Sequence, residues 1–272
     1  MSAPITINDT ETKWSQSRDD LSQHTARPTQ SFPIEVLDKF DISKYNPTKS
    51  FGNPTPLALA GLVLCLTPLS AQLMGWRGAD GSGSANNGAH FFCGGVLLLL
   101  GGILEFFLGN TFAFVVFGSY GGFFLSLGAT LTPGFGALAP YTTDSGALNH
   151  AFYNSFGFFY LFTGLLSVVF LICSIRTNIV FVGIFLAYSI AFPLLAASDW
   201  AKGMGNEHLG HTLLVAGGAA CFVVSMLGWY ALLSSLLQSV DFPFDLPMGD
   251  LSNVILGKQQ RKKLQEEKTK GV

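Results

Sequence analysis

Glu105 is the only acidic residue within the long apolar segments that we predict in this chain, so its carboxyl group is the first candidate for chemistry. Ionisable groups are costly to bury in apolar surroundings and are often functional there, for example as proton relays. Glu105 also lies one turn before Gly109, where it can instead cap backbone groups or reach a polar interface. Asn110 and Thr111 follow this turn, and their types favour turns and helix caps over substrate binding. Glu105 is therefore a proton-relay candidate with a structural alternative.

Four of the five histidines lie at the starts of apolar segments, and Arg77 and Lys202 lie in connections at the same end. The histidines are His90, His150, His208 and His211. Imidazole titrates at about pH 6.5, so these residues are candidate acidity sensors, whereas solvation at an interface is the simpler interpretation. Two isolated basic residues are weak evidence for attraction of an anion.

The sequence indicates no covalent or phosphoryl-transfer chemistry. It has no Ser-His-Asp order, no metal-ligand spacing, no phosphate-binding loop and no dinucleotide fingerprint. The four cysteines lie in apolar segments without Cys-x-x-Cys spacing and are expected to be buried free thiols; they are Cys65, Cys93, Cys173 and Cys221. The net charge of −2 argues against nucleic-acid binding. We expect no enzyme activity, no metal and no cofactor.

Membrane-spanning helices must position these residues. Only 12% of the 272 residues are charged, and most of the charges lie in the two ends of the chain. The region 51–240 contains six apolar stretches, each near the roughly 20 residues needed to cross a bilayer. They cover 56–74, 89–108, 111–131, 152–174, 178–198 and 211–237. The sequence thus predicts an all-α integral membrane protein with a disordered polar tail at 1–50 and a second polar tail at 241–272.

The distribution of basic residues predicts the orientation of these spans. Thirteen Lys and Arg residues lie in the two tails and in the connection that holds Arg176, against two in the connections on the other side. Because cytoplasmic segments carry the excess of Lys and Arg, we expect both termini in the cytoplasm. A transporter, a channel and a membrane sensor all remain possible with this topology.

The first span begins with the sequence FGNPTPLALAGL. Asn53 is a good helix cap, and Pro54 and Pro56 suit a first turn whose N–H groups have no helical partner. This pattern is typical of a well-capped helix start. An alternative is that the free backbone N–H groups of this turn line a pathway and face an anion.

The same residues carry a resemblance to a known family. Asn-Pro-Thr-Pro-Leu-Ala-Leu at 53–59 is similar to the Asn-Pro-Ala-Pro-Leu-Gly-Leu signature of the acetate uptake transporters. The block from Glu105 to Phe112, followed by Gly-Ser-Tyr-Gly at 118–121, resembles a second family pattern, and Phe-Pro-Leu-Leu-Ala at 192–196 resembles a third. The resemblance covers about 51–252 and points to the fungal branch of a family that also includes bacterial succinate–acetate permeases.

The resemblance implies six helices per subunit, a homo-hexamer, and one pathway per subunit that is closed by an apolar constriction of Phe, Tyr and Leu. The Tyr position falls on Tyr120, which matches. The Phe position falls on Leu62 and the Leu position on Tyr188, so two of the three residues depart from the pattern. This set keeps two aromatic rings and adds a hydroxyl group that can donate a hydrogen bond to a passing carboxylate. Asn53, Pro54, Pro56, Asn110, Thr111 and Ser119 are the further pathway or motif candidates.

The resemblance implies that the chain transports acetate or a similarly small monocarboxylate across the plasma membrane, as a proton symporter or as a passive anion channel, with succinate as a further substrate. Its partners are then the carboxylate anion, membrane lipid and further copies of itself. Two alternatives stay open. The Ser/Thr-rich tail at 1–50 is compatible with a membrane sensor or regulatory protein of the acetate response, and fungal members of the family are linked to ammonia or ammonium export.

Overall fold

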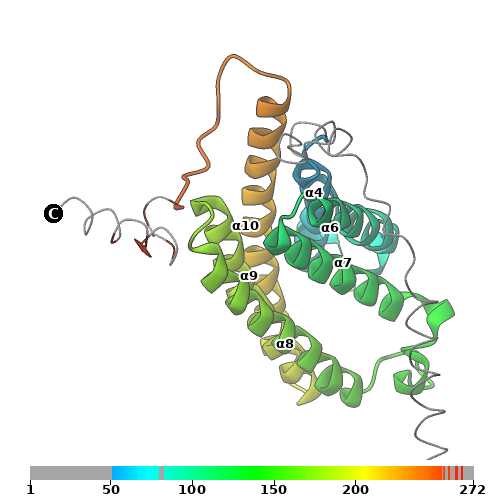
Figure 1. The fold of residues 1–272 in the computed structure, drawn as a ribbon. Coiled ribbons are helices and arrows are strands. Elements are labelled where there is room, and N and C mark those ends of the chain that lie inside the picture. The colour runs from blue at the N-terminus through cyan, green and yellow to red at the C-terminus, as the bar shows by residue number, and fades with distance from the viewer. Residues whose placement is uncertain are drawn as a thin grey trace, which may run out of the picture. The chain divides into compact units, whose positions relative to one another are not determined.

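The computed structural model describes residues 51–79, 83–252, 254, 257, 261, 262 and 265, and the predicted disordered tail at 1–50 lies outside them. Six long helical segments cross the described part, and all six are long and apolar enough to span a membrane (Figure 1). They are α4 (Thr55–Leu73), the composite segment Ser84–Phe107, α7 (Thr111–Leu131), α8 (His150–Ser174), α9 (Ile179–Gly203) and α10 (Glu207–Ser239). The six predicted spans are confirmed, with ends that differ by a few residues.

The second span is built from several kinds of helix. A 3-10 turn, Ser84–Asn86, leads through α5 (Asn87–Ala89) and the π-helix η4 (His90–Leu97) into α6 (Leu98–Phe107). Gly94 lies in the π-helical part, where an added Cβ atom would stand 2.6 Å from Cγ of Phe124. Only glycine therefore allows α7 to approach the second span so closely.

Asparagine caps four of the helices. Asn110, Asn149, Asn178 and Asn206 each accept a hydrogen bond from the backbone N–H three residues later, at the starts of α7, α8, α9 and α10. Such a bond satisfies one of the backbone donors that have no partner in the first turn. The start of α4 differs, because Pro54 is its cap residue and Asn53 accepts from the N–H of Thr55 at 3.0 Å. The prediction that Asn53 is the cap itself is therefore wrong by one position.

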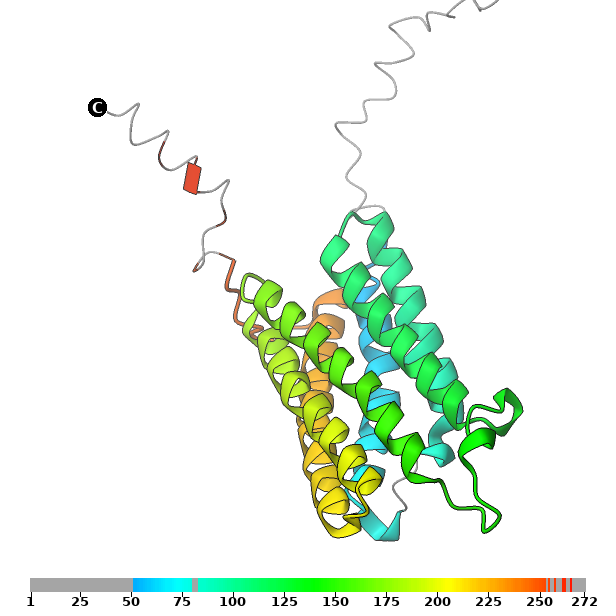
Figure 2. The same ribbon diagram turned by 90° about the horizontal axis from the view of Figure 1, so that it is seen from below.

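The helices form two groups of three. One group contains α4, the η4–α6 segment and α7, and the other contains α8, α9 and α10 (Figure 2). The groups meet where α4 packs against α10. Gly218 and Gly228 of α10 make this contact possible, because added Cβ atoms there would stand 2.8 Å from Cβ of Leu73 and 2.9 Å from Cγ1 of Val63. Small residues at such crossings let helix backbones pack closely within a membrane.

Aromatic side chains fill the space between α7 and the second group. Phe123 of α7 lies 5.3 Å from Phe159 of α8 and 5.2 Å from Phe192 of α9, measured between ring centroids. Tyr120 of α7 stacks on Tyr188 of α9 with a centroid distance of 4.7 Å. The two groups are therefore joined on this side by rings rather than by close backbone contact.

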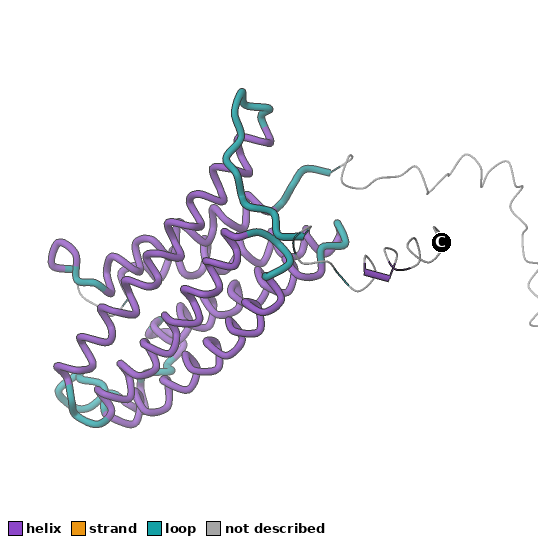
Figure 3. The backbone as a smooth tube through the Cα atoms, turned by 90° about the vertical axis from the view of Figure 1, so that its left-hand side faces the viewer, coloured by secondary structure: helices purple, strands orange, loops and turns teal. Residues whose placement is uncertain are grey.

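The first part of the predicted C-terminal tail is attached to the helices. After α10 the chain turns back toward the start of α9, as Figures 1 and 3 show. The hydroxyl of Tyr230 donates to the carbonyl of Pro247 at 2.8 Å, and the N–H of Ile179 donates to the carbonyl of Gly249 at 2.9 Å. Residues 241–252 thus pack on the α8–α9 connection, which a purely polar, solvated tail would not do.

Candidate functional site

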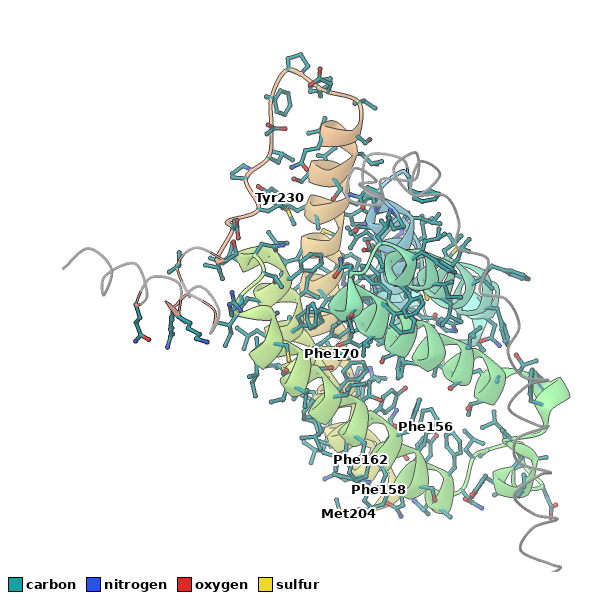
Figure 4. The ribbon with its side chains drawn as sticks, in the orientation of Figure 1. Phe156, Phe158, Phe162, Phe170, Met204 and Tyr230 are labelled. Carbon is teal, nitrogen blue, oxygen red and sulfur yellow. The ribbon has the colours of Figure 1, made fainter. Side chains whose placement is uncertain are left out.

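A cavity of about 450 Å³ lies between the two helix groups. Its walls come from the second halves of α4 and α7, from α9 from Tyr188 onward, and from the first halves of α8 and α10. We call this end of the bundle the loop end, and the opposite end, where α4 begins and α10 finishes, the tail end. Figure 4 shows Phe156, a wall residue, on the side of α8 that faces α7. Phe158 and Phe162 of the same helix are 54% and 63% exposed and belong to its outer surface.

Helix α9 contributes one continuous stripe to the cavity. The stripe consists of Tyr188, Phe192, Leu195, Asp199 and Lys202, separated by four, three, four and three residues. This spacing places all five side chains on one face of an α-helix. The stripe changes from aromatic to aliphatic to charged toward the loop end, so the cavity has an apolar interior and a polar rim.

The rim of the cavity carries charges of both signs. The Lys202 ammonium lies 5.6 Å from the centroid of the Tyr153 ring, a cation–π contact. Glu207 and His211 of α10 are exposed and also border the cavity. Asp199 is different, because its side chain is only 8% exposed and its Oδ2 atom has no hydrogen-bond partner.

Tyr188 forms the inner floor of the cavity. Its side chain is 2% exposed and its ring stacks on Tyr120 at 4.7 Å and on Phe192 at 5.2 Å. Its hydroxyl oxygen has no hydrogen-bond partner. A buried hydroxyl without a partner costs the protein stability, and its proton is not committed to another group of the protein.

The hydroxyl of Tyr120 is already engaged. It lies 2.9 Å from Oγ of Ser167, and Ser167 in turn donates its only hydroxyl proton to the carbonyl of Thr163 at 2.9 Å. Tyr120 must therefore be the donor in its own contact with Ser167. Of the two stacked tyrosines, only Tyr188 has an uncommitted proton.

The two other candidates on the first helix group are Leu62 of α4 and Ser119 of α7. Leu62 is 5% exposed and sits one turn toward the tail end from Leu66, which lines the cavity. Ser119 is half-buried and precedes Tyr120 in the chain. The structure therefore brings Tyr120 and Tyr188 into direct contact, and it places Leu62 on α4, one turn beyond the cavity-lining Leu66.

Glu105 belongs to a separate hydrogen-bonded cluster at the tail end. Its side chain is 2% exposed, the Thr55 hydroxyl donates to Oε1, and the Asn110 side-chain amide donates to Oε2 at 2.9 Å. Asn53 joins the cluster through the N–H of Thr55. Both carboxyl oxygens therefore have partners, and the cluster ties the start of α4 to the α6–α7 turn. Thr111, the first residue of α7, is exposed beside it.

The histidines and cysteines partly depart from expectation. His90 is fully buried with Nδ1 3.3 Å from Oδ1 of Asn87, so interfacial solvation is wrong for this residue. The other three histidines at this end are exposed. All four cysteines are free thiols, but Cys93 is half-buried and Cys173 is exposed on α8, so the expectation of four buried thiols is wrong for these two. The described residues contain no group of three His, Cys, Asp or Glu side chains that could hold a metal ion.

Comparison with known proteins identifies the family. Residues 39–253 match the sequence model of the GPR1/FUN34/yaaH family. The chain belongs to this family. Protein alcS of Aspergillus fumigatus is 48% identical over 210 residues, which cover 75% of this chain and 77% of that protein. Acetate transporter protein patA of Penicillium expansum is 33% identical over 219 residues, covering 80% of this chain and 86% of that protein.

Two further GPR1/FUN34/yaaH comparisons bear on fold and function. Ammonia transport outward protein 2 of Saccharomyces cerevisiae is 31% identical over 211 residues, covering 75% of this chain and 70% of that protein. The solved structure of the bacterial acetate channel SatP is similar to this fold with a TM-score of 0.59 and 25% identity, covering 73% of this chain and 99% of that chain. The six-helix fold and membership in a family of transporters and channels are thereby established.

Two polar residues of this family member were not among the sequence candidates. Asp199 follows the predicted fifth span 178–198 by one residue, but α9 continues to Gly203, so Glu105 is not the only acidic residue in a spanning helix. The helical spacing from Tyr188 through Leu195 was a signal that the same face continues to Asp199. Ser167 had no comparable signal, because its role depends on the approach of Tyr120 from another helix.

Proposed function

We propose that this chain moves acetate, or a similarly small monocarboxylate, through the cavity between its two helix groups. The observation that carries the proposal is the cavity itself, which ends on a buried tyrosine whose hydroxyl is unpaired. An uncommitted O–H at the inner end of an apolar cavity suits a small carboxylate, which accepts hydrogen bonds at both oxygens. The acetate named in two of the compared proteins supports this substrate class.

The constriction of this pathway consists of Leu62, Tyr120 and Tyr188. Stacked rings and an aliphatic side chain form a narrow apolar passage that excludes water, and hydrophobic constrictions of this kind gate by dewetting. Tyr120 keeps its donor on Ser167, so its ring sets the width of the passage. Tyr188 donates the hydrogen bond that compensates the carboxylate for the water it loses.

The other pathway or motif candidates lie between the constriction and the tail end of the bundle. Pro54 and Pro56 lie at the start of α4, Asn53 and Asn110 make hydrogen bonds there and to Glu105, and Thr111 begins α7. Ser119 lies between this region and the constriction on α7. Glu105 has two roles that can be distinguished. It is a relay for the co-transported proton, or its hydrogen bonds only stabilise the packing of the α6–α7 turn against α4.

Orientation and assembly complete the proposal. Thirteen of the fifteen basic residues belong to the two terminal segments and to the connection that holds Arg176, which supports a cytoplasmic position for both termini in the plasma membrane. The outer surfaces of several helices expose large apolar side chains, among them Phe92 at 71%, Phe107 at 69% and Ile172 at 65%. Such surfaces are compatible with contact to lipid and to neighbouring subunits of a homo-hexamer.

Export of ammonia or ammonium is the second candidate function. One of the compared proteins carries that name, and two carboxyl groups, Asp199 and Glu207, border the cavity where a cation would enter. A regulatory role in the acetate response is the third. It would require the tail at 1–50 for function, whereas a transporter should keep its flux when residues 1–45 are deleted.

The test is uptake of labelled acetate into liposomes that hold the purified protein, with and without an imposed pH gradient. We expect acetate flux above that of protein-free liposomes, driven by the gradient if protons are coupled. Labelled methylammonium in the same vesicles serves as the comparison substrate. Flux of methylammonium without flux of acetate would replace the acetate proposal with the ammonium alternative.

A further inference from the structure

Asp199 stands out among the polar residues of the cavity because the pathway described above does not use it. It lies near the end of α9, on the same face as Tyr188, and borders the cavity. Only 8% of its surface is exposed, and its Oδ2 atom has no hydrogen-bond partner. A buried carboxyl oxygen without a partner points to a ligand that supplies one.

Among the described residues, the surroundings of Asp199 provide one favourable charge, that of Lys202, but no ion pair. Lys202 follows by one turn, but its ammonium lies over the Tyr153 ring at 5.6 Å, and no ion pair joins it to Asp199 in the described part of the chain. The titratable and charged groups that border the cavity near Asp199 come from three helices. They are Tyr153 and Tyr160 of α8, Tyr188 and Lys202 of α9, and Glu207, His211 and Cys221 of α10.

An ionised and a protonated Asp199 would act on an entering carboxylate in opposite ways. The ionised form is favoured by the charge of Lys202 but has no hydrogen bond at Oδ2, and it repels a second carboxylate. The protonated form is neutral and has an O–H group that can donate to a carboxylate oxygen. A carboxylate therefore binds beside Asp199 favourably only when a proton is present.

We propose that Asp199 is the proton-loading residue of the cavity, which takes up a proton at the loop end and hydrogen-bonds the entering carboxylate. This inference rests on the proposed transport of a monocarboxylate. The proton passes from the Asp199 oxygen to the carboxylate oxygen, so one O–H bond breaks and one forms, and the substrate continues as the neutral acid. Asp199 is left as a carboxylate and regains its proton from water at the rim.

The spacing along α9 supports this order of events. Asp199 and Tyr188 are eleven residues apart, which corresponds to about 16 Å along the helix axis. Between them, α9 presents only Phe192 and Leu195 to the cavity. An anion would cross this apolar stretch at high cost, whereas a neutral acid crosses it easily. The substrate then reaches the unpaired hydroxyl of Tyr188.

The experiment compares the wild type with Asp199→Asn in liposomes. Asparagine keeps the size and a hydrogen-bond donor but cannot carry the proton. Wild-type acetate uptake should respond to a pH gradient and not to a potassium diffusion potential set with valinomycin. Asp199→Asn should lose most of the uptake that the pH gradient drives, because acetate then remains an anion, which crosses the apolar stretch between Asp199 and Tyr188 at high cost. The matched control Asp144→Asn, in an exposed loop at the same end, should behave as the wild type.

The outcomes separate the two proposals. A pH-gradient response in Asp199→Asn equal to that of the wild type would overturn the role of Asp199. Absence of acetate flux in the wild type would instead overturn the proposed function. Size-exclusion profiles check that each variant is folded. If the asparagine variant does not fold, Asp199→Glu replaces it, and its pH response must persist with a shifted midpoint for the proposal to stand.

Discussion

Replacement of Tyr188 by phenylalanine should separate transport from stability. The change removes one oxygen atom and leaves the ring that stacks on Tyr120 and Phe192. Because the hydroxyl of Tyr188 has no partner in the protein, its removal breaks no internal hydrogen bond. The variant should therefore fold at least as well as the wild type and transport acetate less well.

The changes in transport and in stability both follow from one hydrogen bond. The Tyr188 hydroxyl does not make it within the protein and makes it to the substrate when the substrate binds. A hydrogen bond between neutral groups contributes about 0.5–1.5 kcal/mol, and the substrate reaches Tyr188 as the neutral acid, so loss of this bond should reduce acetate flux at low concentration roughly 2- to 13-fold. A buried polar group without a partner costs about 1–3 kcal/mol, so Tyr188→Phe should raise the free energy of unfolding by about 1 kcal/mol or more.

Two measurements on the same purified samples test these effects. Initial rates of labelled-acetate uptake into liposomes give the transport change, and thermal unfolding in detergent gives the stability change. Tyr230→Phe is the matched control. The hydroxyl of Tyr230 donates to Pro247 outside the cavity at 2.8 Å, so this change should lower stability slightly and leave flux unchanged.

The reasoning about Tyr188 is refuted by either of two results. Wild-type flux in Tyr188→Phe would mean that its hydroxyl does not bind the substrate. A clear loss of stability would mean that the hydroxyl has a partner within the protein.

Three further predictions address the remaining residues. Tyr120→Ala should let larger acids such as succinate pass, as measured by competition against labelled acetate, and unchanged selectivity would remove Tyr120 from the constriction. Glu105→Gln can accept from Asn110 through its amide oxygen and donate to the Thr55 hydroxyl through its amide nitrogen, so a weaker response to a pH gradient at wild-type stability would assign Glu105 a relay role. Glu105→Ala loses both bonds and should lower the free energy of unfolding by about 2–3 kcal/mol. Native mass spectrometry in mild detergent should detect a hexamer, and a monomer alone would contradict the assembly.

The six apolar spans could be predicted from the sequence because their length and composition are enough to identify them. A stretch such as 111–131 has no charge and ends in turn residues, and α7 covers the same residues. The π-helix η4 was not predictable, because the approach of Phe124 to Gly94 depends on packing between helices.

Only part of the candidate site could be predicted from the sequence. The resemblance named Tyr120 and Tyr188, and the structure stacks them, but sequence alone gave no sign that one hydroxyl is engaged and the other free. Asp199 was missed because the predicted fifth span ends at residue 198, before this first charged residue. In the structure, α9 continues past Asp199 to Gly203. Burial of a single charged residue is a property of tertiary packing.

The most direct test of the central claim is acetate flux through a protein whose cavity is filled. Leu127 is 5% exposed and lines the cavity from α7, so Leu127→Trp places a larger side chain in the proposed pathway. Leu165 on the outer surface of α8 is 58% exposed, and Leu165→Trp is the matched control. We predict that liposomes with Leu127→Trp show little acetate uptake above protein-free liposomes, while Leu165→Trp equals the wild type. Wild-type uptake by a folded Leu127→Trp protein would contradict a pathway through this cavity.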